Sequence, residues 1–95
     1  MTINSLRTRR DEILSVASRH GAMNVRVFGS TVRDEAGSAS DVDFLVDFHS
    51  NRSLLDQAGL QIDLQAILQV PVDVATVAGL KPRIRELVLR EAVAL

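Results

Sequence analysis

The chain of 95 residues contains no cysteine, tyrosine or tryptophan and only three phenylalanines. Without cysteine it has no disulfide, no thiolate metal site and no cysteine nucleophile, which fits a reducing compartment. The scarcity of aromatic rings argues against a surface that stacks nucleic-acid bases. A net charge of −1 argues against a module that binds duplexes through many phosphate contacts. Direct nucleic-acid binding is therefore not expected.

Long apolar runs are also missing from the sequence. No stretch approaches the roughly 18 apolar residues of a membrane span, and the first residues lack the apolar region of a signal peptide. We therefore expect a cytoplasmic protein that does not associate with membranes. The hydrophobic content of 46% is mostly aliphatic and is sufficient for one core. The length suits one domain over residues 1–95.

Hydrophobic periodicity predicts alternating helices and strands. The expected elements are a helix over 5–20, a strand over 24–28, a short helix from Ser30, a strand over 42–48, a helix from Ser53 to about 69, a strand over 72–77 and a helix from Pro82 to about 93, with a loop over 35–40. In the helix that Ser53 caps, we expect Leu55, Ala58 and Ile62 to face inward. In the last helix we expect the same of Ile84, Leu87 and Val88. This order indicates an α/β (α+β) fold with a small mixed sheet flanked by helices.

Two carboxylates stand at strand spacing in Asp41-Val42-Asp43 and therefore project from one side of the predicted strand. Unscreened carboxylates roughly 4 Å apart repel by about 4 kcal/mol at an effective dielectric of about 20. A divalent cation would relieve this repulsion, and Mg²⁺ is favoured because it binds carboxylate and phosphate oxygens together. Considered alone, the pair is also compatible with solvent-facing residues of an edge strand.

Asp73 lies between two valines, so it faces away from the core if the valines enter it. A neighbouring strand would then bring it beside Asp41 and Asp43, and three carboxylates are enough for a two-metal site. The plain alternative is an ordinary polar position on an alternating strand.

A glycine-serine turn precedes these acids. Gly29 permits a positive φ or a close backbone approach, and Ser30 begins a short helix whose start favours a phosphate. Arg33, one turn later, would reach a phosphate or form a surface ion pair with Asp34 or Glu35. Ser40 would orient Asp41 or only serve the turn. A simple strand-to-helix connection is the alternative for the turn as a whole.

Taken together, Gly-Ser-x-x-Arg, then Ser-Asp-x-Asp, then an aspartate thirty residues beyond Asp43 resembles the nucleotidyltransferase superfamily of DNA polymerase β, and in particular its minimal (MNT-domain) subgroup. The resemblance implies a polymerase-β-like fold. It also implies the site residues: Asp41, Asp43 and Asp73 as catalytic metal ligands, and Gly29, Ser30, Arg33 and Ser40 as the nucleotide-binding group.

Minimal members of this superfamily are commonly antitoxins paired with a HEPN-domain ribonuclease. The resemblance therefore implies Mg²⁺-dependent transfer of AMP from ATP to a HEPN toxin held in a hetero-oligomer. Two alternatives stay open. One is an antitoxin that neutralises its toxin by binding alone, and the other is a nucleotidyltransferase for a small molecule or RNA whose substrate-binding part is a separate chain.

Overall fold

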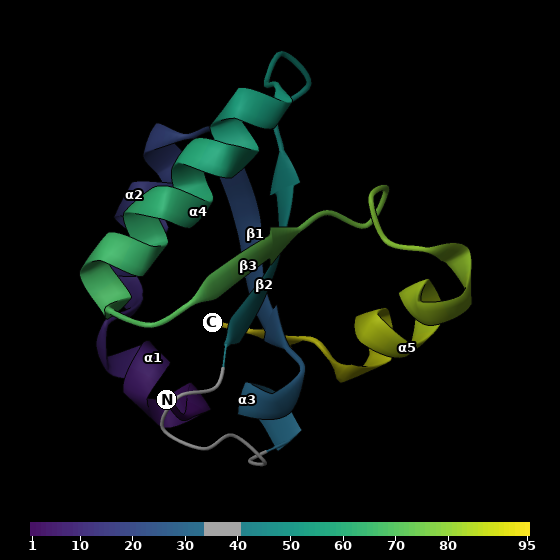
Figure 1. Cartoon of the computed structure of the whole chain (residues 1–95), viewed down its shortest axis with the longest axis horizontal. Helices are drawn as coiled ribbons and strands as arrows, with labels where there is room; N and C mark the ends of the chain where they lie inside the picture. The colour runs from purple at the N-terminus through teal and green to yellow at the C-terminus, as the bar shows by residue number, and fades with distance from the viewer. Residues whose placement is uncertain (34–40) are drawn as a thin grey trace.

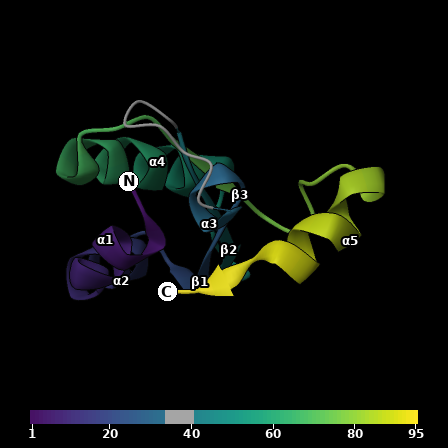
Figure 2. The same ribbon diagram turned by 90° about the horizontal axis from the view of Figure 1, so that it is seen from below.

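The computed structural model describes residues 1–33 and 41–95 and shows helices on both sides of a central sheet (Figure 1). The elements in chain order are α1 Ile3–Thr8, α2 Arg10–Arg19, β1 Ala22–Phe28, α3 Ser30–Arg33, β2 Val42–Phe48, α4 Leu54–Leu68, β3 Val72–Ala75, α5 Pro82–Glu91 and β4 Val93–Ala94. Seen from below, α1, α2 and α4 lie on one side of the sheet and α5 lies on the other (Figure 2). The predicted α/β class with a mixed sheet flanked by helices is confirmed.

The strands are arranged in the order β3-β2-β1-β4. β1 pairs antiparallel with both β2 and β4, whereas β2 and β3 run parallel and are joined by α4. The bounds of β2 agree with the predicted strand over 42–48. β3 ends at Ala75, two residues before the predicted end, and β1 begins two residues earlier than predicted.

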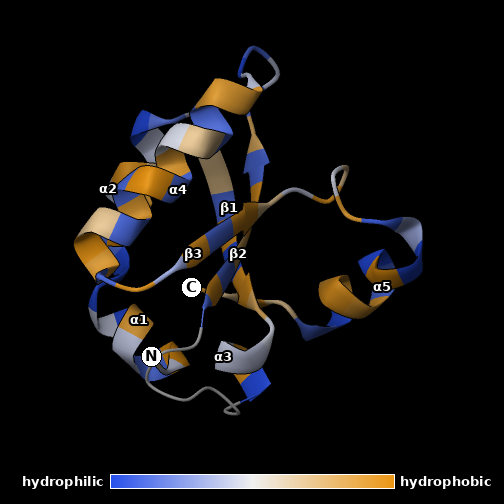
Figure 3. Ribbon diagram, viewed as in Figure 1, coloured by the Kyte–Doolittle hydropathy of each residue, from blue (hydrophilic) through white to orange (hydrophobic). Residues whose placement is uncertain are grey.

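The main core lies between the sheet and the helices α1, α2 and α4. Val42, Phe44 and Val46 of β2 are buried on this face, as their period of two predicts. They pack with leucines and valines of the neighbouring elements, including Leu60 and Val27. Hydrophobic segments accordingly line the sheet and the helices that cover it (Figure 3). The acids of β2 therefore face the other side of the sheet, toward α5.

The orientation of α4 differs from the prediction. Leu55, Ala58 and Ile62 are exposed, Leu55 at 83% and Ile62 at 63%, while the core is filled by Leu60, Leu64 and Leu68. Both sets have helical spacing, so periodicity alone could not choose between them.

The reason for this orientation is a row of glutamines beside the leucine row. Gln57 donates to the carbonyl of Val74 at 2.7 Å. Gln61 accepts from the N–H of Val74 at 3.3 Å, and Gln65 accepts from the N–H of Val72 at 3.1 Å. The edge strand β3 thus obtains hydrogen bonds from side chains of α4, which stabilises the helix in the observed rotation.

Both terminal helices also differ from the prediction. The helix expected over 5–20 is broken at Arg9, which has ψ of 18° between α1 and α2. The Thr8 hydroxyl donates to the Ser5 carbonyl at 2.7 Å, a side-chain bond of the kind that bends helices. The last helix ends at Glu91 rather than near 93, because the chain becomes extended at Ala92 and pairs with β1 as β4.

The inward face predicted for α5 is only partly correct. Val88 is buried, but Ile84 and Leu87 are exposed because α5 lies apart from the main core. None of the helices described here is long and apolar enough to span a bilayer.

Candidate active site

Adjacent parallel strands bring Asp43 and Asp73 side by side. Their Cα atoms are register partners, with Val42 opposite Val72 and Phe44 opposite Val74. Since these flanking residues are buried on the helix-covered face, both aspartates project from the opposite face. Asp41, two residues before Asp43, is exposed at the start of β2. The structure therefore places Asp73 beside Asp43, with Asp41 near enough for its charge to act on the Asp43 carboxyl.

Asp43 is the partly buried member of this group. Burial, followed by the negative charges of Asp73 and Asp41, raises the pKa of the Asp43 carboxyl above its ordinary value of 3.8. Arg33 acts in the opposite direction and Glu91 adds a smaller rise. Ionised Asp43 is thus held at an electrostatic cost, and a bound cation would remove that cost.

Gly29 lies directly against the Asp43 carboxylate. Its φ is +81°, and a Cβ placed on it would lie 2.5 Å from Asp43 Oδ2. The position therefore requires glycine for two reasons, the left-handed backbone and the close approach of the carboxylate. The carbonyl of Gly29 accepts from the N–H groups of Val32 and Arg33, so α3 begins at Ser30 as predicted.

Sequence reasoning missed one residue of the site, Glu91 in the last turn of α5. Its Oε2 accepts from the backbone N–H of Gly29 at 3.2 Å, and its Oε1 accepts from the Arg33 guanidinium. The Glu91 side chain is only 17% exposed. The available signal was its position, because an acid at the C-terminal end of a helix opposes the helix dipole and needs another reason to be there.

Ser40, which was predicted to orient Asp41, lies outside the described residues. So do Asp34 and Glu35, the alternative partners considered for Arg33.

The donor set fits a hard divalent cation, because it consists of carboxylate oxygens whose mutual repulsion raises the pKa of Asp43. In the part of the chain that the structure describes, no three acidic or histidine side chains are close enough together to hold a metal ion by themselves. A cation bound here would therefore complete its shell with phosphate or water oxygens, as Mg²⁺ usually does.

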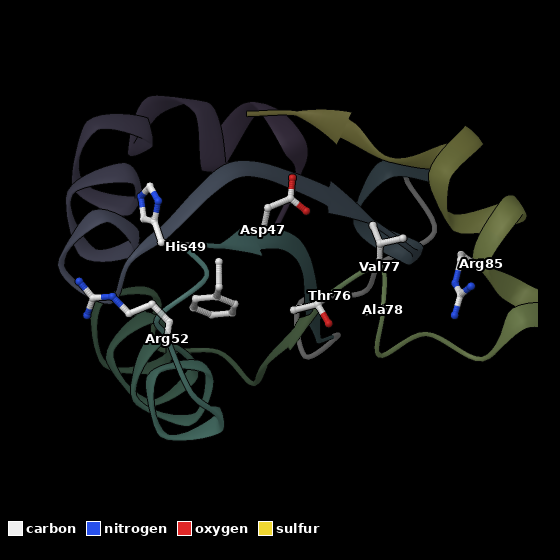
Figure 4. Close-up of a pocket in the computed structure, with 8 residues that line it drawn as sticks. Asp47, His49, Arg52, Thr76, Val77, Ala78 and Arg85 are labelled. Carbon is white, nitrogen blue, oxygen red and sulfur yellow. The ribbon is translucent and has the colours of Figure 1, made fainter.

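Two cavities lie on this side of the sheet. One, of about 470 Å³, is lined by Arg33, Leu87, Arg90 and Glu91 and adjoins the glycine-serine turn. The other, of about 530 Å³, lies beyond the far ends of β2 and β3 (Figure 4). His49 and Arg52 line it at one end and Arg85 at the other, with Asp47 between them. Asp47 is four residues beyond Asp43, which is roughly 13 Å along the strand, so the second cavity is separate from the acids.

A glycine-serine turn, an arginine and neighbouring aspartates thus lie together where β1 ends and where β2 and β3 begin. A family model described as the nucleotidyltransferase domain matches residues 10–95. The chain belongs to this family, and its fold is the polymerase-β-like nucleotidyltransferase fold.

Known relatives place the chain with the minimal members of the family. A solved structure provisionally described as a minimal nucleotidyltransferase shares 52% identity and a TM-score of 0.86, covering 100% of this chain and 97% of the other. The protein adenylyltransferase MntA of Thermococcus cleftensis is 47% identical over 75 residues, which is 79% of this chain and 76% of MntA. The predicted resemblance is thereby confirmed.

A more distant structure shows the fold alone. It is a toxin-antitoxin complex with AMP-PNP, and its matching chain has a TM-score of 0.75 at 16% identity. The match covers 88% of this chain and 69% of that one.

Proposed function

We propose that this protein transfers AMP from ATP to a HEPN-domain toxin, as the antitoxin of a toxin-antitoxin pair. The observation that carries the proposal is the register of Asp43 beside Asp73, with Gly29 against the Asp43 carboxylate. The name of the MntA relative supports protein adenylylation, and the bound AMP-PNP of the distant complex supports ATP as the donor.

In the proposed reaction a hydroxyl oxygen of the acceptor forms a bond to the α-phosphorus of ATP. The bond from that phosphorus to the β-phosphate oxygen breaks, and pyrophosphate leaves with its electron pair. Bound Mg²⁺ would neutralise the developing charge on the phosphate oxygens. Asp41 and Asp43 would hold the ion, Arg33 would attract the polyphosphate, and the Gly29–Ser30 turn would position it.

Asp73 has a separate part in this proposal. Asp41 and Asp73 are exposed whereas Asp43 is half-buried. With Asp41 assigned to the ion, Asp73 is the remaining acid that an acceptor hydroxyl can approach from solvent. Asp73 would accept the hydroxyl proton as the new bond forms. We place the acceptor hydroxyl on the toxin partner, and the reaction therefore in a hetero-oligomer.

The test uses purified protein, ATP labelled at the α-phosphate, Mg²⁺ and the copurified HEPN partner. We expect a labelled partner band that requires Mg²⁺ and disappears in Asp41→Ala. The matched control is Asp47→Ala, which removes an acid of β2 that pairs with Arg26 and lies away from the turn. Equal labelling by Asp41→Ala and wild type would refute the assigned site. Labelled RNA or a labelled small molecule, with no labelled protein, would refute the protein acceptor.

A second function, neutralisation by binding alone, is favoured by the exposed apolar side chains Leu54, Leu55 and Ile62 on α4. Apolar groups gathered on a surface commonly mark a protein contact. The double variant Asp41→Ala, Asp43→Ala separates the two functions in a toxin-protection assay. Full protection by this variant would show that transfer is not required, and lost protection with retained partner binding would support catalysis.

A further inference from the structure

We infer that Glu91 is a positioning residue of the nucleotide site, which holds the Gly29 turn and Arg33 in a fixed relation to Asp43. The inference rests on the proposed function, since it assigns a role within the same site. Glu91 would not contact the reacting atoms. It would act through two groups that do contact the nucleotide.

The short strand β4 explains how Glu91 reaches the turn. Val93 of β4 is the antiparallel partner of Val27 in β1. Counting two residues back from Val93 and two residues on from Val27 places Glu91 opposite Gly29. The hydrogen bond from the Gly29 N–H to Glu91 Oε2, at 3.2 Å, agrees with this register. β4 thus aligns the end of α5 with the end of β1.

Each carboxylate oxygen of Glu91 has its own partner. Oε2 accepts from Gly29 and Oε1 accepts from Arg33, so one side chain fixes both the turn and the guanidinium. Hydrogen bonds to an ionised, largely buried carboxylate are among the stronger ones in proteins. The Gly29 turn also adjoins Asp43, whose carboxylate occupies the space that a Cβ on Gly29 would fill.

The same contact is within reach of a ligand. Glu91 and Arg33 line the cavity of about 470 Å³ together with Arg90. Pairing with Glu91 places the Arg33 guanidinium at the wall of this cavity. The competing interpretation is that Glu91 only fills the place of a phosphate until a nucleotide displaces it. The two interpretations predict opposite effects when Glu91 is replaced.

The test compares Glu91→Gln and Glu91→Ala by titration calorimetry with ATP and Mg²⁺. Glutamine keeps an oxygen that accepts from Gly29 but loses the charge that orients Arg33, whereas alanine loses both. We therefore expect Kd for ATP to rise about tenfold or more in Glu91→Ala, the lower end of the range found for groups that orient metal ligands, and by a smaller factor in Glu91→Gln. Glu86→Gln and Glu86→Ala alter an exposed acid on the same helix and should leave Kd unchanged.

Two further measurements separate positioning from general destabilisation. Amide hydrogen exchange of Gly29, followed by NMR, should accelerate in Glu91→Ala and only slightly in Glu91→Gln. The effects of Arg33→Ala and Glu91→Ala on Kd should be less than additive, because both changes break one link.

Unchanged or tighter ATP binding in the Glu91 variants would overturn the inference and favour the phosphate placeholder. An equal loss of ATP affinity in the Glu86 control variants would also overturn the inference. If the wild type itself shows no saturable, Mg²⁺-dependent ATP binding, the proposed function fails and the inference fails with it. That result appears before any variant is compared, so the two failures are distinguishable.

Discussion

Replacing Gly29 with alanine tests how closely the turn and the acid depend on each other. Gly21 provides a matched control, because it also has a positive φ, +74° compared with +81° for Gly29. In both positions the new methyl group would be too close to a neighbour. At Gly29 the neighbour is Asp43 Oδ2 at 2.5 Å, and at Gly21 it is Nε of the long Arg52 side chain at 2.2 Å.

The left-handed backbone alone costs about 1–2 kcal/mol for a residue with a Cβ. For a domain of this size that corresponds to a fall in Tm of roughly 4–16 °C, and both variants should show it. The consequences for activity differ. The Arg52 side chain is flexible and lies away from the acids, whereas the Asp43 carboxylate must shift by about 1 Å to make normal contact. A displacement of that size in a catalytic group typically costs about 100-fold in rate.

The assay pairs thermal unfolding of both variants with their rates of AMP transfer under saturating Mg²⁺, at a temperature where both remain folded. We expect similar losses of Tm and a loss of rate confined to Gly29→Ala. Equal rates in the two variants would refute the argument that Gly29 sets the position of Asp43. Wild-type Tm in both variants would refute the assigned backbone conformations.

Two other predictions concern stability. Asp43→Asn should raise the stability of the metal-free domain at neutral pH by up to about 1 kcal/mol, because it removes the repulsion between solvent-screened carboxylates on adjacent strands. Folding raises the pKa of Asp43, so the contribution of its protonated form to stability is complete below pH 3.8 and is lost as pH rises through the folded-state pKa. The stability advantage of Asp43→Asn should therefore vanish in acid. A gain in stability that persists in acid would contradict the raised pKa of Asp43. In denaturant unfolding, Leu60→Ala should lower the free energy of unfolding by about 2–5 kcal/mol, because Leu60 is buried. Leu55→Ala should lower it by less than about 0.5 kcal/mol, because Leu55 is exposed. Equal losses would contradict the observed rotation of α4.

Local chemistry made much of the fold predictable. In β2, the buried residues Val42, Phe44 and Val46 alternate with Asp43, Leu45 and Asp47, and the period of two predicted both the strand and the face of its acids. Ser53 was a sound helix signal as well, because its hydroxyl and the Asp56 carboxylate form a capping box at the start of α4. These features depend on residues that are neighbours in the chain.

The features that could not be predicted depend on distant partners. Glu91 is 62 residues from Gly29, and nothing near Glu91 indicates that β4 will align the two. The rotation of α4 was ambiguous because apolar residues occur all around this helix, and only contact with the edge of β3 selects one face. The proximity of Asp73 to Asp43 was predictable from their shared pattern, but their register required the structure.

The row of glutamines on α4 also limits how this protein can assemble. An open strand edge is a template on which another chain can add a strand, and such addition leads to domain swapping or fibrils. At β3 the amide groups of Gln57, Gln61 and Gln65 already occupy outward backbone positions of Val72 and Val74. A partner chain therefore cannot pair with β3 unless α4 first moves away from this edge. A partner that binds on that side has to contact side chains rather than the strand backbone.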